Sequence, residues 1–349
     1  MNEAKLRPTI KDIARLSETS PSTVSAVLTG NWKARRISEA LASRIQAVAG
    51  EQGYSANRQA RGLRRGRSDM VGLIVPLHDS RYFAAIAQSF EAEARDRGWC
   101  PIVVSTLRDP AEELRTAERL ISHAVDALVI AGASNPAALG ALCQAAGVPH
   151  VYLDLPGPDA PSVASDNHAG AMLLTNTLLD HAVAGHDGPR SRAHFLGGSP
   201  DDAASARRIE GFHQAMAQRH LSVAPDQVIA CGYAPSRARD AVAALCDRLG
   251  GLPATLFINS VTVFEGAMTH FATLAPADFA GTVIGCYDYD PIASFLPFPV
   301  HMIRQNAEAL AARAFALIDE GASEPTLIEI VPDLVPPRTI HAKPFFDLG

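Results

Sequence analysis

Several polar residues in the larger, C-terminal part of the chain are of the types that hold a hydroxylated small molecule. Five of them each come shortly after a strand-like apolar run: Asp79, Asp154, Asn259, Asp288 and Gln305. Carboxylates and amides offer paired acceptors and donors for neighbouring hydroxyl groups, and Tyr233 is a candidate ring to stack on a sugar. Any single carboxylate could instead be a helix cap or a turn residue. Their shared position after strands is what favours a sugar-type binding site.

The elements that must position these residues alternate along the chain from residue 70. Amphipathic helical patterns include residues 82–97, 111–123, 203–220, 236–249 and 306–320. The expected strands lie between such patterns, at Met70–Val75, Ile102–Ser105, Ala127–Ala131, His150–Leu153, His194–Leu196, Val228–Ala230, Thr255–Ile258, Thr282–Cys286 and His301–Ile303. Repeated strand–helix units predict parallel sheets with right-handed crossovers. They could close one (β/α)₈ barrel, but two doubly wound lobes are favoured, since a ligand then binds between them at the strand ends.

The first 68 residues differ in charge from the rest of the chain. They contain 13 basic and five acidic residues, whereas the remainder contains 18 basic and 32 acidic residues, and the net charge is -6. A basic head on an acidic body is typical of a nucleic-acid-binding segment, because phosphate neutralisation supplies most non-specific affinity for DNA. A solubilising tail is the alternative explanation of the charge alone.

Two short helices separated by a polar break are predicted in this basic segment. Thr9 can cap the first, whose apolar positions are Ile10, Ile13, Ala14 and Leu16. Ser20 is the N-cap of the second and Pro21 its first residue. The second helix buries Val24, Val27 and Leu28, and its outward positions, suited to base and phosphate contacts, are Ser22, Thr23, Ser25 and Ala26. This pattern predicts a helix-turn-helix.

Basic residues lie both before and after a third predicted helix. The loop Asn31–Arg36 supplies Asn31, Lys33 and Arg35 as candidate DNA contacts, and Ser38 caps the third helix, which ends at Gly53. Residues 57–68 contain two glycines and five arginines, so an isolated helix there is marginal in water. This segment is either a charged linker or a helix that folds only on DNA. Its candidate contacts are Asn57, Arg58, Ala60 and Leu63, the last as an apolar wedge in the minor groove.

Residues 9–28, 54–57 and 60–63 together resemble the lactose repressor family (LacI/GalR type), and the resemblance covers nearly the whole chain. It implies that Ser22 and Thr23 lie on the recognition helix and that Leu63 is an intercalating leucine. Ala26 stands where many relatives carry an arginine that reads guanine, and Glu18 replaces a frequent turn glycine. The operator sequence is therefore not implied.

The resemblance also implies a two-lobed body, similar to periplasmic sugar-binding proteins, with three chain crossings expected near Asn167, Pro299 and Pro325. It adds Arg208 as an effector contact and matches four other positions to effector contacts: Tyr233, Asn259, Asp288 and Gln305. Ser260 departs from the aspartate that commonly follows the asparagine. Residues 195–198, 246–249 and 264–266 look closest to fructose and sucrose operon repressors, which favours fructose or a phosphorylated fructose. Arg81 and Arg208 could hold a phosphate as well as a hydroxyl group.

Composition and the absence of certain motifs exclude several other classes of protein. A chain of 349 residues that is 47% hydrophobic and 19% charged is not a disordered polyampholyte. It has no apolar run of the roughly 18 residues that a membrane helix needs, no secretory signal pattern and no CxxC pair among its five cysteines. GxGxxG, P-loop and GxSxG motifs are absent, and the histidine pairs lack helical ligand spacing. We expect a cytoplasmic protein without catalytic residues, cofactor, metal or membrane contact.

Together these observations predict an all-α helix-turn-helix head (residues 1–55), a hinge or linker (56–68) and an α/β body (69–349) of two doubly wound parallel-sheet lobes. The predicted function is a repressor of a sugar-utilisation operon that binds palindromic operator DNA as a homodimer, because one short recognition helix reads too few bases. A sugar-binding transport protein would share the body but would lack the head. An enzyme on the doubly wound lobes is a further alternative, but no nucleophile–base set stands out in the sequence. An architectural nucleic-acid protein would need only the head and would leave the body unexplained.

Overall fold

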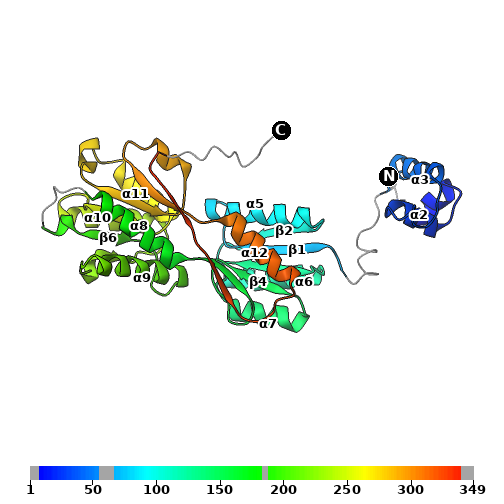
Figure 1. Cartoon of the computed structure of the whole chain (residues 1–349), viewed down its shortest axis with the longest axis horizontal. Coiled ribbons are helices and arrows are strands. Elements are labelled where there is room, and N and C mark those ends of the chain that lie inside the picture. The colour runs from blue at the N-terminus through cyan, green and yellow to red at the C-terminus, as the bar shows by residue number, and fades with distance from the viewer. Residues whose placement is uncertain (1–7, 55–66, 183–187, 339–349) are drawn as a thin grey trace, which may run out of the picture. The chain divides into compact units, whose positions relative to one another are not determined.

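The computed structural model describes residues 8–54, 67–182 and 188–338 (Figure 1). The chain forms two compact units, Met1–Ser68 and Asp69–Gly349. Within the described ranges, none of the helices is both long enough and apolar enough to span a membrane.

The first unit is built from three short helices, α1 (Ile10–Leu16), α2 (Pro21–Leu28) and α3 (Glu39–Glu51). Each begins where a hydroxyl oxygen accepts from an otherwise unpaired amide near the helix start. Thr9 accepts from Asp12 and donates to its carboxylate in a capping box, Ser20 accepts from the Thr23 amide at 3.1 Å, and Ser38 accepts from the Leu41 amide at 3.3 Å. The three predicted caps are confirmed.

The core of this head is formed by Ile13, Val24 and Ile45, all fully buried, and by small residues around them. Two orientations predicted from the sequence are wrong. Ala26 is only 6% exposed rather than outward, because the turn after α2 folds back over it, with the Asn31 amide on the Ala26 carbonyl at 2.9 Å. Leu16 is 45% exposed, because Ser17 takes the interior position at the end of α1.

The second unit contains two lobes, each with a six-stranded sheet. The first lobe has the all-parallel order β11-β5-β4-β3-β1-β2. Its strands are β1 (Met70–Val75), β2 (Cys100–Ser105), β3 (Ala127–Ala131), β4 (His150–Leu153), β5 (Ser162–Ser165) and β11 (Leu327–Ile330). Helices α5 (Arg81–Asp96) and α12 (Ala307–Asp319) cover one face, and α6 (Pro110–Ser122) and α7 (Pro136–Ala146) cover the other.

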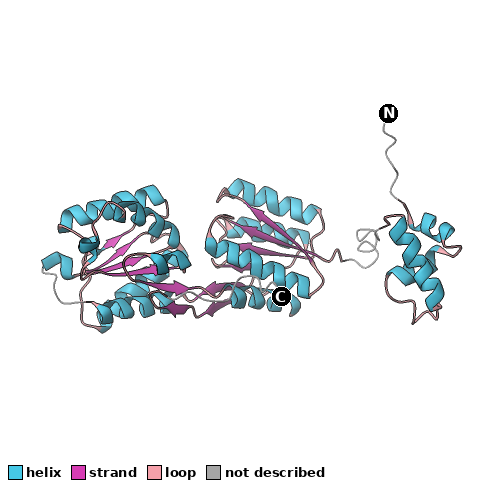
Figure 2. Ribbon diagram, turned by 90° about the horizontal axis from the view of Figure 1, so that it is seen from above, coloured by secondary structure: helices cyan, strands magenta, loops and turns pink. Residues whose placement is uncertain are grey.

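The second lobe has the order β12-β10-β9-β8-β6-β7, in which only β12 runs antiparallel to its neighbour. Its strands are β6 (Ala193–Leu196), β7 (Val228–Ile229), β8 (Thr255–Ile258), β9 (Val283–Tyr287), β10 (Val300–Arg304) and β12 (Asp333–Val335). Helices α8 (Asn167–His181) and α9 (Ala203–Gln218) cover one face, and α10 (Pro235–Leu249) and α11 (Val261–Phe271) cover the other. Figure 2 shows each sheet between two layers of helices. The predicted fold class is thus confirmed, and a single barrel is excluded.

The chain passes between the lobes at three crossings. The first lies at Asp166, between β5 and α8, as predicted near Asn167. The second lies at Gln305–Asn306, between β10 and α12, and the third at Val331–Pro332, between β11 and β12. The positions predicted near Pro299 and Pro325 are therefore wrong, because each of these prolines precedes a strand that still belongs to the lobe the chain is leaving.

Candidate functional site

The main cavity of the second unit is a cleft of about 1300 Å³ lined by both lobes. Its walls come from the segments after β1, β2 and β4 and from α5 in the first lobe, and from the segments after β7, β8, β9 and β10 and the start of α9 in the second. The carboxyl ends of parallel strands are where α/β sheets bind ligands, because loops rather than side-chain layers close the sheet there. This cleft is the candidate effector site.

Six of the eight effector contacts predicted from the sequence line the cleft: Arg81, Asp154, Arg208, Tyr233, Asp288 and Gln305. The other two do not. Asp79 is exposed in the loop after β1, and Asn259 is fully buried behind Arg208. Asn259 therefore supports the wall of the cleft from behind. Asp79 stays a predicted effector contact that does not line the cleft.

Arg208, on α9, is only 4% exposed and is fixed from several sides. Its Nε donates to Asn167 Oδ1 at 2.7 Å, and its Nη1 donates to the Asn259 carbonyl at 2.6 Å. The guanidinium carbon lies 3.8 Å from the centre of the Tyr287 ring, within cation–π range. A buried arginine with this many partners is a rigid donor for a ligand rather than a mobile surface charge.

Two carboxylates face this arginine from opposite lobes. Asp154 follows β4 and Asp288 follows β9, and both have left-handed backbone angles (φ 74° and 99°). Such strain at a non-glycine residue often accompanies a functional site. Loss of solvent raises the pKa of Asp154 to about 6, although the Arg208 charge opposes this, and it raises the pKa of Asp288 in the same way. Gln305 donates to Asp288 Oδ1 at 2.6 Å.

Tyr233 is held by hydrogen bonds that start at Asn259. The Asn259 amide donates to Ser205 Oγ at 3.2 Å, Ser205 Oγ pairs with the Tyr233 hydroxyl at 2.7 Å, and that hydroxyl donates to Asp202 at 2.5 Å. Burial raises the pKa of Tyr233 to about 12, so it stays protonated. The ring is thus presented to the cleft in a fixed orientation.

The structure adds cleft residues that the sequence did not reveal. Arg108, after β2, lies 5.8 Å from the Tyr233 ring centre and 6.0 Å from that of Phe83. Leu107 and Arg108 both adopt left-handed φ angles, which no local pattern signals. Tyr82 lies in the first turn of α5, and an aromatic residue so close to a strand end could have been noticed.

Unused hydrogen-bonding capacity remains in the cleft. Gln305 Oε1, which lines the cavity, is a buried polar atom without a hydrogen-bond partner among the residues described, and the Tyr82 hydroxyl interacts only with the Asp154 carboxylate. Buried polar groups without partners are costly in proteins, so such atoms commonly await a ligand or water. A compound with several hydroxyl groups could satisfy a phenol, an amide and carboxylates together.

An ion pair joins the two lobes beside the cleft. Arg81, the first residue of α5, contacts Asp290, which follows β9 in the other lobe, at 2.9 Å between Nε and Oδ2. The Arg81 side chain is nearly half exposed, so the pair contributes little to stability. It is a direct polar contact between the two lobes.

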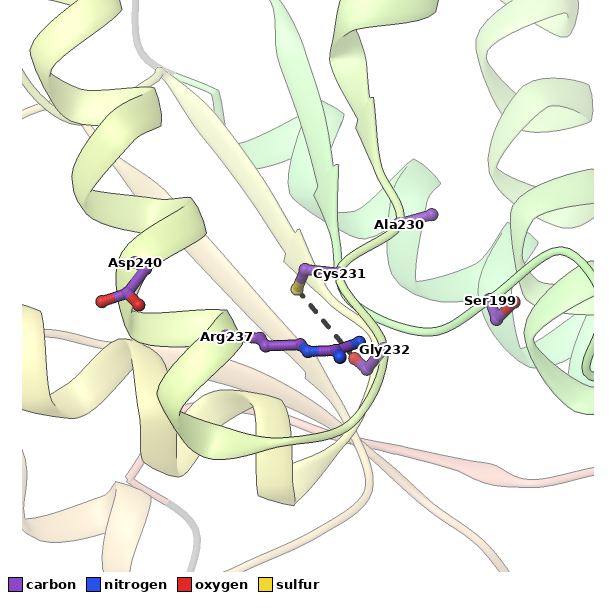
Figure 3. Close-up of a pocket in the computed structure, with 6 residues that line it drawn as sticks. All are labelled: Ser199, Ala230, Cys231, Gly232, Arg237 and Asp240. Atoms are coloured by element: carbon purple, nitrogen blue, oxygen red, sulfur yellow. Dashed lines mark hydrogen bonds between the residues drawn. The ribbon is translucent and has the colours of Figure 1, made fainter.

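A smaller cavity of about 410 Å³ lies at the end of β7 in the second lobe (Figure 3). Figure 3 shows Arg237 extending from α10 toward Gly232, with Cys231 beside it and Asp240 directed away. Burial raises the pKa of the Cys231 thiol, which disfavours a reactive thiolate. This cavity draws on one lobe only, so the larger cleft is the better candidate.

In the head, most of the predicted DNA contacts within the described residues are accessible. Ser22 is exposed, and Thr23 and Ser25 are half-buried on α2. Asn31, Lys33 and Arg35 are exposed in the following loop, where the Lys33 ammonium lies 5.3 Å from the Trp32 ring centre. Thr9, Ser20 and Pro21 are at helix starts. Asn57, Arg58, Ala60 and Leu63 lie outside the described residues.

Comparisons with known proteins agree with this architecture. Residues 9–57 match the lacI family of bacterial regulatory proteins, and residues 71–293 match the periplasmic binding protein domain. A ribitol operon repressor of Klebsiella aerogenes is 49% identical over 190 residues, covering 54% of this chain and 70% of that protein. A sucrose operon repressor of Klebsiella pneumoniae is 31% identical over 327 residues, covering 91% and 95%. A lac repressor dimer bound to operator and the anti-inducer ONPF has the same fold, with a TM-score of 0.78 at 18% identity, covering 94% of this chain and 97% of that one.

A helix-turn-helix head joined to a two-lobed body of the periplasmic-binding-protein type defines a class of ligand-responsive DNA-binding regulators. The likeness to the sucrose operon repressor extends over nearly the full length of both chains. The chain belongs to the lacI family of bacterial regulatory proteins, and it is a DNA-binding transcriptional regulator.

Proposed function

We propose that this protein represses a sugar- or polyol-utilisation operon and that an uncharged polyhydroxy compound in the inter-lobe cleft changes its affinity for the operator. The observation that carries this proposal is the convergence of Arg208, Asp154 and Asp288 from both lobes on one cavity. A ligand can shift an equilibrium between lobe arrangements only if it binds them with different affinity, and contacts from both lobes provide that difference.

The charges around Arg208 favour a neutral ligand over a phosphorylated one, although Arg108 is a further cation in the cleft. Arg81 is paired with Asp290, and Arg208 already donates to Asn167 and Asn259. A phosphate near Arg208 would also approach the carboxylates of Asp154 and Asp288. Fructose itself, favoured by the sequence, and ribitol and sucrose, suggested by the two repressors above, are therefore better candidates than a fructose phosphate.

The DNA contacts proposed for the head come from the exposed side of α2 and the loop after it. Ser22, Thr23 and Ser25 offer short hydroxyl groups for base edges and phosphates, while Lys33 and Arg35 neutralise the DNA backbone. We propose a homodimer on a palindromic operator, because two recognition helices related by two-fold symmetry read enough bases for specificity. Coupling of about 1–3 kcal/mol between effector and operator would be typical.

The test is an operator-binding titration with and without candidate effectors. The duplex is a labelled DNA fragment from upstream of the gene that encodes this protein, and fluorescence anisotropy should show that the protein binds it in a salt-dependent way. Ribitol, fructose, sucrose and fructose 1-phosphate are then added in separate titrations. We expect one of the neutral compounds to alter the operator affinity about 5- to 150-fold. Arg208→Ala and Asp288→Ala should lose this response while retaining DNA binding, and Asp79→Asn serves as an exposed control. Absence of binding to any duplex at low salt would refute the proposal.

A further inference from the structure

One buried amide connects the cleft with the first crossing between the lobes. Asn167 is the first residue of α8, directly after the crossing at Asp166, and it is 4% exposed. Its Oδ1 accepts from Arg208 Nε at 2.7 Å, and its Nδ2 donates to the carbonyl of Ser165 at 3.1 Å. Since Ser165 ends β5 in the first lobe, this single side chain joins that lobe to the arginine of the second.

Helix α8 does not need this side chain as a cap. Asp166 is the N-cap residue, and its carboxylate accepts from the Ala169 amide at 2.8 Å. At the first helical position an alanine would therefore serve the helix as well. The buried side-chain amide of Asn167 thus contacts Arg208 and the crossing rather than capping the helix.

The residue beneath Arg208 also reaches the crossings. Tyr287, fully buried under the guanidinium, donates through its hydroxyl to the Asp166 carbonyl at 3.5 Å. A Cβ added at Gly170 would lie 2.5 Å from this hydroxyl and 2.7 Å from Pro332 of the third crossing. The support of Arg208 is therefore packed against the first and third crossings between the lobes.

We propose that Asn167 is a positioning residue, which fixes the Arg208 guanidinium for the effector and transmits its displacement to the first crossing. This inference rests on the proposed function and specifies how the same cleft senses its occupant. A hydrogen bond to a charged group orients the arginine before the ligand arrives, so the ligand need not restrict its rotamers.

Three substitutions at this position separate positioning from a structural role. In the full-length chain, Asn167→Ala should weaken binding of the active probe, ribitol or fructose, about tenfold to a hundredfold in calorimetric titrations. It should also reduce the ratio of operator affinities measured with and without the probe. Asn167→Asp keeps an acceptor for Arg208 Nε but has no donor for the Ser165 carbonyl, so it should bind the probe more tightly than the alanine variant while losing part of the operator response. Asn167→Gln displaces the acceptor by one methylene and should resemble the alanine variant.

Asn176 provides a matched control on the same helix. Its Oδ1 accepts from Arg219 Nε at 3.0 Å, but neither residue lines the cleft. Asn176→Ala should leave probe binding and the operator response unchanged. If Asn167→Ala and Asn167→Gln both bind the probe like wild type, or if Asn176→Ala shows the same loss, the positioning role is overturned while the proposed function stands. If the wild-type chain responds to neither probe nor any other neutral sugar, the proposed function fails and this inference with it.

Discussion

Replacing Asp154 with asparagine should make the second unit more stable at neutral pH. The pKa of Asp154 is raised from 3.8 to about 6, mainly because solvent is excluded from its carboxyl group. The folded state therefore binds the proton more tightly than the unfolded chain does. The stability that this tighter proton binding gives the folded state is fully present below pH 3.8, and it is lost as the pH rises to about 6. Raising the pKa from 3.8 to about 6 corresponds to a cost of about 3 kcal/mol at pH 7.5.

The assay is urea unfolding of wild type and Asp154→Asn at two pH values, followed by Trp99 fluorescence in a Trp32→Phe background. Trp99 lies in the first lobe, 6.0 Å from the Phe315 ring centre, so it reports on the lobe that contains Asp154. The variant should be more stable by up to about 3 kcal/mol at pH 7.5, and this advantage should be roughly half as large at pH 5. The attraction of the Asp154 carboxylate to Arg208 and its repulsion by Asp288 are lost in the variant, and the pKa of about 6 already includes both effects.

The pH dependence of the difference is the decisive observation. A stability gap of equal size at pH 5 and pH 7.5 would show that the carboxyl group is not penalised by its surroundings. Asp79→Asn, an exposed aspartate of the same lobe, is the control and should change the free energy of unfolding little at either pH. A similar gain in that variant would point to a general charge effect rather than to the cleft.

Three further predictions concern the head, the contact between the lobes and the predicted linker. Glu18 has a left-handed φ of 49°, so Glu18→Gly should stabilise the head by about 0.5–1 kcal/mol in thermal unfolding followed by Trp32 fluorescence; a lower melting temperature would contradict this. Arg81→Ala removes a half-exposed ion pair with Asp290, and urea unfolding should show a loss of no more than about 1 kcal/mol; a much larger loss would mean that the pair is structural. Leu63→Ala should weaken operator binding in anisotropy titrations without affecting sugar binding, and equal operator affinity would remove its predicted wedge role.

The central strands could be predicted from the sequence because parallel strands covered on both faces are continuous apolar runs. The bounds predicted for β1, β3, β4 and β8 agree with the structure. Strands β5, β11 and β12 were not predicted. Ser162–Ser165 is half polar, Leu327–Ile330 contains a glutamate and alternates in exposure, and Asp333–Val335 has only three residues. Because β11 and β12 were unrecognised, the last crossing was placed too early.

Two site residues could be predicted because they directly follow a recognisable strand, whereas Asn259, which directly follows β8, is buried behind the wall of the cleft. Asp154 and Asp288 follow β4 and β9 and lie in the cleft. Asp79 is separated from β1 by a loop that carries it to the surface, which strand position alone does not reveal. Arg108 depends on an unusual loop conformation, and Asn167 depends on a contact with a residue 41 positions away. Such positions are set by tertiary packing rather than by local pattern.

The distribution of the cleft residues over the two lobes limits which compounds can act as effectors. Asp154 belongs to the first lobe, while Arg208 and Asp288 belong to the second, and Gln305 lies on a crossing itself. A compound that reaches only one lobe binds the open and closed arrangements equally and therefore shifts nothing, however tightly it binds. A compound long enough to contact Asp154 and Arg208 together must favour the arrangement that brings them close. Effector strength should therefore follow the span between hydroxyl groups more closely than the total number of hydrogen bonds.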